Sequence, residues 1–170
     1  MEQSKNYTYK NVFLSLGGNE KNSLKIFEQT IDYFKTNHKL IKQSAVYSSE
    51  PWGFNETVSP FFNQVIQIET KYSPEELLIQ TQKLEKHFGR PTKTKNEYES
   101  RPIDIDILIF DKKVINSQKL TIPHYLMHKR NFVLIPFNEI ASDFLHPVFH
   151  KTINDLLLYS PDQLTVFKHK

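Results

Sequence analysis

The chain has 170 residues, 38% of them hydrophobic and 24% charged, which predicts one globular domain over residues 1–170 with a sizeable buried core. Its formal net charge of +3 suits an anionic small ligand but not nucleic acid, which favours a denser Lys/Arg stripe, and the absence of cysteine excludes disulfides and thiolate metal sites. The N-terminal residues have no apolar signal core, and no stretch approaches the ~18 apolar residues of a membrane span, so we expect a cytoplasmic protein with no membrane partner.

The first predicted unit is a strand, a glycine turn and a helix. Residues 12–16 are apolar and stop at Gly17 and Gly18, where we expect a tight turn that uses positive φ angles. A phosphate-cradling loop is not indicated, because neither the Walker pattern nor G-x-G-x-x-G is present. A helix follows the turn, since apolar residues recur at helical spacing at Leu24, Phe27, Ile31 and Phe34.

The next segments predict two strands that flank a long loop, followed by a second helix. Residues 40–47 have an extended pattern, and the loop over 48–60 carries the only tryptophan, Trp52, either as a lid over a flat ligand or as a packed anchor. Residues 61–70 alternate as a strand. Ser73 and Glu76 predict a capping box at the start of the second helix, and Gly89 suits its C-terminal end.

Two carboxylates stand out in the apolar run over residues 101–110. The alternation predicts a strand with Asp104 and Asp106 on one face, their Cα atoms roughly 6 to 7 Å apart. Two ionised groups at that spacing repel by roughly 2 to 3 kcal/mol at a local dielectric of about 20, so we expect a cation between them. Magnesium or an arginine such as Arg101 would serve. The alternative is that both aspartates face solvent from a half-exposed strand.

The charged loop over residues 90–100 leads into this strand. Its Arg90, Lys93 and Lys95 are cations of the kind that a polyphosphate needs, although a solvated charge run would have the same composition. The order strand, helix, strand, strand, helix, strand predicts a ferredoxin-like βαββαβ core in the α/β (α+β) class, with helices over an antiparallel sheet.

C-terminal additions follow this core. Residues 133–141 predict a helix in which Pro136 is a kink or a first-turn residue, residues 152–158 predict another helix, and residues 164–167 are extended. Histidine pairs four residues apart have neither a glutamate between them nor an evident third ligand, so zinc is not expected.

The sequence resembles the 6-hydroxymethyl-7,8-dihydropterin pyrophosphokinase family of the folate pathway. Arg101-Pro-Ile-Asp-Ile-Asp-Ile107 is similar to the family signature R-x-L/I-D-L/I-D-I, and Thr121-Ile-Pro-His-Tyr125, followed by Arg130 and Phe132, stands at the family's spacing. The likeness runs from Leu14 to Ala141. It implies a monomer with a ferredoxin-like fold that moves a pyrophosphoryl group from ATP to the pterin hydroxymethyl oxygen and leaves AMP.

The resemblance also implies roles for individual residues. Asp104 and Asp106 match the pair that holds two Mg²⁺ ions against the triphosphate, and Arg101 and Arg90 match catalytic arginines. Asn63 matches a residue that bonds the pterin edge, between the stacking pair Phe61 and Phe132. The remaining pterin contacts match Ser49, Pro51, Trp52 and Gly53, and the ATP contacts match Gln82, Glu85, Ile107, Lys119, Thr121, His124, Tyr125 and Arg130.

The chain departs from the family in its charged loop. Tyr98-Glu99-Ser100 stands where many relatives carry Trp-Gly-Pro, Glu97 and Lys119 stand where arginine is common, and Thr92 replaces a basic residue. A weaker phosphate grip, or a compensating role for Lys93 or Lys95, would follow. Two other functions are weighed against the pterin kinase. A different two-metal phosphoryl transferase would use the same D-x-D, whereas an RNA-binding module would need an RNP-like pattern, which is absent.

Overall fold

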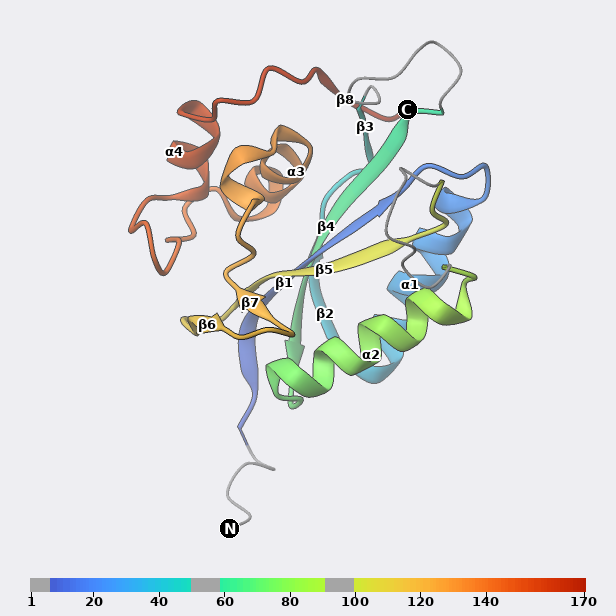
Figure 1. The fold of residues 1–170 in the computed structure, drawn as a ribbon, viewed down its shortest axis with the longest axis horizontal. Coiled ribbons are helices and arrows are strands. Elements are labelled where there is room, and N and C mark those ends of the chain that lie inside the picture. Colours follow the sequence, from blue (N-terminus) through green and yellow to red (C-terminus); the bar gives the residue numbers. More distant parts are fainter. Residues whose placement is uncertain (1–6, 50–58, 91–99) are drawn as a thin grey trace.

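The computed structural model describes residues 7–49, 59–90 and 100–170, and its centre is a twisted antiparallel sheet (Figure 1). The strands lie in the order β5-β1-β4-β3-β8, and β2 pairs with the other end of β4. This order, with a helix after β1 and another after β4, confirms the predicted ferredoxin-like core. The strands are β1 (Tyr9–Gly18), β2 (Lys39–Gln43), β3 (Tyr47–Ser49), β4 (Phe61–Thr70), β5 (Asp104–Phe110) and β8 (Val166–Lys168).

Two helices, α1 (Ser23–Asn37) and α2 (Pro74–His87), cover one face of the sheet (Figure 1). The expected capping box of α2 is present, because Ser73 Oγ accepts from the Glu76 N–H and the Glu76 carboxylate accepts from the Ser73 N–H. The helix ends before Gly89, whose φ of 89° suits a glycine C-cap. Fully buried apolar side chains such as Leu14, Ile66 and Phe34 fill the interface, which closes this face.

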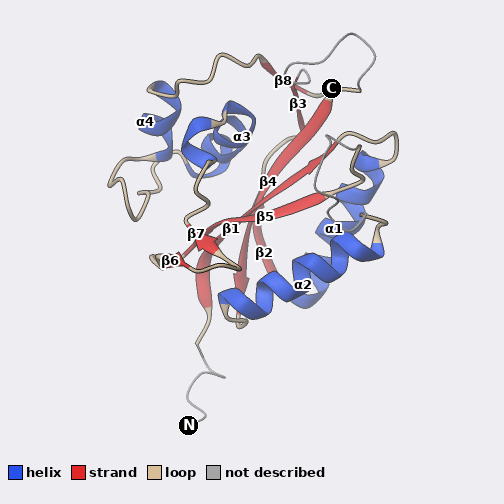
Figure 2. Cartoon of the chain, viewed as in Figure 1, coloured by secondary structure: helices blue, strands red, loops and turns tan. Residues whose placement is uncertain are grey.

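The opposite face carries α3 (Asn131–Ala141), with α4 (Ile153–Leu158) packed beside it (Figure 2). Pro136 lies in the interior of α3, so the first-turn alternative for this residue was wrong. The chain reaches α3 from β5 through the short strands β6 (Ile115–Asn116) and β7 (Thr121–Ile122) and the 3-10 turn η1 (Met127–Lys129). None of the helices in the described ranges is both long and apolar enough to cross a membrane.

Strand β5 departs from strict alternation at one point. Ile107 pairs with Leu14 and Ile109 pairs with Phe13, so Leu108 is the extra residue of a β-bulge. Ile109 therefore packs beside Leu108 against α3, whereas Ile107 belongs to the core under α1 and α2. The regular alternation that we expected along the whole run ends at this bulge.

The glycine pair at the end of β1 is extended rather than turned. Gly17 and Gly18 both pair with β4, and neither has a positive φ, so the expected turn was wrong. The reason for glycine at position 18 is space: a Cβ there would lie 2.6 Å from the Pro102 carbonyl oxygen and 2.6 Å from Ser23 Oγ. The close approach of α1 and the residues before β5 to this strand requires a residue without a side chain.

Candidate active site

The candidate site lies on the α3 face of the sheet, where β5, β1 and β4 extend beyond that helix. The strand register puts Asp104, Gly17 and Asn63 in one row, and Asp106 lies in the next row opposite Ser15. Gly17 contributes no side chain between Asp104 and Asn63. The register therefore brings the predicted metal ligands and the predicted pterin ligand onto one face of the sheet, with Gly17 as the floor between Asp104 and Asn63.

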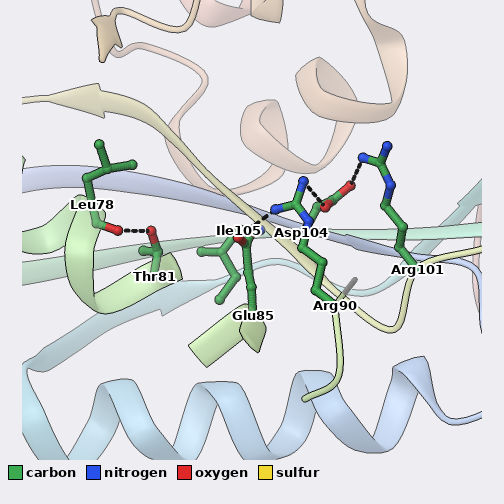
Figure 3. A network of polar contacts seen from close by, with 7 residues as sticks. All are labelled: Leu78, Thr81, Glu85, Arg90, Arg101, Asp104 and Ile105. Atoms are coloured by element: carbon green, nitrogen blue, oxygen red, sulfur yellow. Dashed lines mark hydrogen bonds and ion pairs between the residues drawn. The ribbon is translucent and has the colours of Figure 1, made fainter. Parts of the chain in front are cut away.

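Two arginines pair with Asp104 (Figure 3). Arg101 Nη1 donates to Asp104 Oδ2 at 3.0 Å, and Arg90 Nη2 lies 2.9 Å from Asp104 Oδ1. The second contact lacks hydrogen-bond geometry, so Oδ1 is a buried oxygen without a hydrogen-bond donor among the described residues. The arginine that we considered as a counter-ion is thus present at Asp104, and one carboxylate oxygen keeps an unused lone pair.

Arg101 is positioned by the end of β1. The Asn19 N–H donates to the Arg101 carbonyl at 3.1 Å, and the Arg101 N–H donates to Asn19 Oδ1 at 2.8 Å. Asn19 itself is buried. This pair of bonds fixes the backbone just before β5, so the Arg101 side chain can reach Asp104 three residues later.

Glu85 connects α2 to the same cluster. Its Oε1 accepts from the Ile105 N–H at 2.7 Å, and its Oε2 pairs with Arg90. The residue is 6% exposed, and burial raises the pKa of its carboxyl group, although the Ile105 N–H and the Arg90 charge act in the opposite direction. Glu85 thereby ties the C-terminal half of α2 to the edge of β5 (Figure 3).

Asp106 and His124 form the outer part of the site. Asp106 is exposed and makes no ion pair within the described ranges. Burial lowers the pKa of His124, while the charge of Asp106 raises it and the charge of Arg130 lowers it. His124 Nδ1 accepts from the Leu126 N–H at 3.3 Å, so the neutral ring carries its proton on Nε2. The Nε2–H can therefore donate a hydrogen bond to a phosphate oxygen.

The start of α3 places Arg130 and Phe132 at the border of the site. The Arg130 guanidinium lies 5.6 Å from the centre of the Phe132 ring, which is half-buried against the α3 core. The neighbouring Asn131 is held by the C-terminal segment, because Asp162 accepts from both its backbone and its side-chain amide, at 2.7 and 3.0 Å. These contacts fix the first turn of α3 beside the open strand ends.

Asn63 and Ser49 form the buried polar end of the site on β4 and β3. The Asn63 side-chain amide donates to Ser49 Oγ at 3.3 Å, and both residues are less than 5% exposed. Phe61 is half-buried two residues away on the same face as Asn63. The predicted pterin contacts Pro51, Trp52 and Gly53 lie outside the described residues, as do Lys93, Lys95 and the departures at Thr92, Glu97 and Tyr98.

The other predicted ATP contacts differ in their surroundings. Gln82 and Lys119 are exposed, Tyr125 is 64% exposed and stacks on His124, and Thr121 is half-buried in β7. The Ile107 side chain is 4% exposed in the core, which leaves only its backbone for a ligand. The structure therefore gathers the acidic pair, the two arginines, His124, Asn63 and the start of α3, and leaves Gln82 and Lys119 at the periphery.

Sequence reasoning missed Gly17 and the ion-pair role of Glu85. In the sequence, Gly17 stands out only as the neighbour of Gly18. The strand register is needed to show that Gly17 lies between Asp104 and Asn63. Among the described residues no group of three metal-ligating side chains meets. Two cavities, of about 430 and 520 Å³, lie elsewhere, beside the C-terminal end of α3 and between α1 and α2.

Comparison with known proteins decides the family. The family model for 7,8-dihydro-6-hydroxymethylpterin-pyrophosphokinase (HPPK) matches residues 13–142. The chain belongs to the HPPK family. The chain is 35% identical over 144 residues to a 2-amino-4-hydroxy-6-hydroxymethyldihydropteridine pyrophosphokinase of Aquifex aeolicus, with 85% of this chain and 88% of the relative covered. A Porphyromonas gingivalis enzyme of the same name is 36% identical, with 80% and 93% covered. This HPPK is therefore an ATP-dependent pyrophosphokinase of folate biosynthesis.

Solved structures support the fold of this HPPK. Plasmodium falciparum HPPK-DHPS, crystallised with pteroate, matches 92% of this chain with a TM-score of 0.74 at 17% identity. The chain spans 43% of that longer protein, and 18% of a Pneumocystis carinii folic acid synthesis protein to which it is 37% identical. The structural likeness thus supports the ferredoxin-like fold of this chain, which matches one part of that longer protein.

Proposed function

We propose that this HPPK transfers the pyrophosphoryl group of ATP to the hydroxymethyl oxygen of 6-hydroxymethyl-7,8-dihydropterin and releases AMP, with two Mg²⁺ ions held by Asp104 and Asp106. The observation that carries the proposal is the row Asp104–Gly17–Asn63, which joins an acidic pair to a buried amide across an open floor. An acidic pair suits a metal–triphosphate complex, and an amide suits the edge of a heterocycle.

The donor set fits magnesium. Mg²⁺ prefers carboxylate oxygens, and Asp104 Oδ1 is buried without a hydrogen-bond donor while Asp106 is exposed and accessible. Mg²⁺ bound there would neutralise charge on the transferring phosphoryl group and on the leaving oxygen. Arg101 and Arg90 already balance the charge of Asp104, and they would neutralise the charge of phosphate oxygens in the same way.

The remaining residues orient the two substrates. His124, whose backbone N–H donates to the Leu108 carbonyl of β5 at 2.9 Å, would offer its Nε2–H to the triphosphate, and the Arg130 guanidinium would offer further donors. The Asn63 amide would bond the pterin edge, and Phe132 would stack on the ring together with Phe61. In phosphoryl transfer of this kind, positioning and charge neutralisation supply most of the rate, so these residues need not include a dedicated general base.

The product distinguishes this proposal from another two-metal phosphoryl transferase with the same acidic pair. Incubation of the protein with ATP, magnesium and the hydroxymethyl-dihydropterin should yield AMP in a pterin-dependent reaction. ADP as the nucleotide product, or AMP release that is independent of the pterin, would overturn the assignment. The row that contains Asn63 favours the pterin, because a carboxylate pair alone would not require a buried amide beside it.

We also infer that residues 143–170 complete the same domain, as α4 packs on α3 and β8 pairs with β3. The monomeric state and the cytoplasmic location stay predictions. Gel filtration with light scattering would test the first, and fractionation of the source cells would test the second.

A further inference from the structure

The Arg90 guanidinium is shared by two carboxylates of different exposure. It pairs with Glu85, whose side chain is 8% exposed, and it approaches Asp104, whose side chain is 28% exposed. The Arg90 side chain itself is 17% exposed. Figure 3 shows the guanidinium between the two acidic groups, with Glu85 toward the interior and Asp104 toward Arg101. Arg90 thus bridges the interior of the protein and the surface of the candidate site.

The two ends of this bridge are held differently. Glu85 is fixed by the Ile105 N–H at 2.7 Å, and the Arg90 N–H donates to the Glu85 carbonyl at 3.0 Å, so backbone and side chain join the same two residues. The contact with Asp104 has a short distance but no hydrogen-bond geometry. Asp104 also has Arg101 as a second partner. The contact between Arg90 and Asp104 is therefore the one that can break.

We propose that Glu85 is a positioning residue that retains Arg90 beside the site when a divalent cation replaces this guanidinium on Asp104. The inference rests on the proposed function, because it requires Asp104 to be a metal ligand. A buried guanidinium without a carboxylate is strongly disfavoured. Because Arg90 keeps its ion pair with Glu85, it can leave Asp104 without losing both of its carboxylate partners. It then stays within reach of incoming phosphate oxygens.

Removal of the Glu85 charge should make Arg90 compete with the metal. In Glu85→Gln the amide oxygen can still accept from the Ile105 N–H, but the ion pair with Arg90 is lost. Asp104 then becomes the remaining carboxylate partner of Arg90 among the described residues. The divalent cation must displace a guanidinium that has no alternative partner, so its affinity should fall.

The test is a double-mutant cycle in which calorimetric titration measures the binding of the preformed complex of Mn²⁺ and α,β-methylene-ATP. Glu85→Gln should weaken Mn²⁺–nucleotide binding about tenfold in the presence of Arg90, and by less than about twofold in the Arg90→Gln background. Equal losses in both backgrounds would show a simple charge effect of Glu85 and overturn the inference. Glu69→Gln, which breaks the exposed ion pair with Lys39, is the matched control and should leave binding unchanged.

Asp106→Asn separates this inference from the function on which it rests. If Asp106→Asn leaves Mn²⁺–nucleotide binding unchanged, the metal assignment and the role of Glu85 both fail. If it abolishes binding while the cycle shows equal losses, the role of Glu85 alone fails.

A measurement on the unmodified protein avoids any folding defect of the Glu85 variant. The side-chain Nε–H resonance of Arg90, assigned by its absence in Arg90→Lys, reports how freely the guanidinium rotates. We expect hindered rotation to persist after saturation with magnesium and α,β-methylene-ATP. Rotation as fast as that of a solvated arginine in this complex would overturn the inference.

Discussion

The two faces of the central sheet differ in how completely they are covered. The face under α1 and α2 is closed by apolar side chains such as Leu14, Ile66 and Phe27, which are at most 1% exposed. The face under α3 is covered over only part of its length, and polar side chains occupy the strands where the helix ends. The closed face supplies most of the packing, while the open face can present charged groups without burying them.

Gly17 and Gly18 give the sharpest form of this comparison, because a side chain at each of these two positions would point to a different face of the sheet. A Cβ on Gly18 would collide with Pro102 and Ser23 on the closed side, whereas a Cβ on Gly17 would meet Asn63 Oδ1 at 3.5 Å, an ordinary contact. The same residue type is thus required for packing on one face and for an open floor on the other.

The largest expected effect is on turnover, from Asp106→Ala on the open face. AMP formation should fall by at least about a thousandfold, because a proposed metal ligand is lost from a reaction that depends on charge neutralisation. The melting temperature should barely change, since Asp106 is exposed. Asp104→Ala should lower turnover similarly but also reduce stability, because Arg90 and Arg101 lose a partner. Near-normal AMP formation in Asp106→Ala would remove the two-metal proposal.

Gly18→Ala tests the closed face. The added methyl group has no room beside a backbone carbonyl, so we expect the free energy of unfolding to fall by about 2 to 4 kcal/mol, as in overpacked cores. Urea unfolding followed by circular dichroism measures this change. A loss below about 0.5 kcal/mol would mean that the strand ends can separate more easily than their packing indicates.

Phe132→Ala tests the aromatic border of the open face. Loss of the ring should weaken pterin binding about ten- to a hundredfold, while binding of α,β-methylene-ATP changes by less than about threefold. Calorimetric titration with each ligand separately measures both affinities. Equal losses for the two ligands would contradict a stacking role and would instead indicate a general disturbance of the start of α3.

Gly17→Ala is the counterpart of the Gly18 substitution. Stability should change by less than about 1 kcal/mol, because the new methyl group has ordinary contacts and alanine restricts the unfolded chain. Pterin affinity should nevertheless fall several-fold, since the methyl group stands on the floor between Asp104 and Asn63. A large loss of stability with unchanged pterin affinity would show that this glycine serves packing, like its neighbour.

The smallest effect concerns pH and two histidines, the half-buried His38 near one face and the buried His146 near the other. Burial lowers the pKa of His38 and of His146 to about 4. Both rings are therefore neutral in the folded protein, and the unfolded chain binds more protons once the pH falls below about 6.5. Their contribution to stability is complete above that pH and is lost as the pH falls from about 6.5 toward 4.

Urea unfolding at pH 7.5 and at pH 5 measures this dependence. His146 Nδ1 accepts from the Val148 and Phe149 N–H groups, while His128 and His150 are the titratable groups that act on its charge. His146→Asn keeps an acceptor in place of Nδ1 without a titrating ring, so its stability should depend less on pH. An unchanged pH dependence in this variant would exclude His146 as a contributor.

Local patterns predicted most of the fold. The capping box at Ser73, the glycine end of α2 and the alternation of Asp104 and Asp106 each depend on residues close in sequence, and the structure contains all three. What failed depends on distant partners. The bulge at Leu108 and the extended Gly18 follow from how β1 meets β5 and α1, which no local spacing records.

The site follows the same rule. The candidate residues were predicted from the D-x-D spacing and the resemblance to a family, but their contacts with one another were not predicted. Asp104 of β5 contacts Arg90, which follows the end of α2, and Arg90 pairs with the buried Glu85 of α2, so this set of contacts requires α2 and β5 to pack together first. The sequence indicated a cation near the aspartates and named Arg101 as one candidate, and the tertiary structure adds Arg90 as a second partner of Asp104.

The bonds between Asn131 and Asp162 have a consequence for anyone who grafts or trims this enzyme. The family match ends at residue 142, yet Asp162 lies twenty residues beyond it and grips the first turn of α3 next to Phe132. A chimera assembled from the matched segment alone would leave the first turn of α3 without its hydrogen bonds to Asp162. The C-terminal segment thus fixes one border of the candidate site, although the family match does not extend to it.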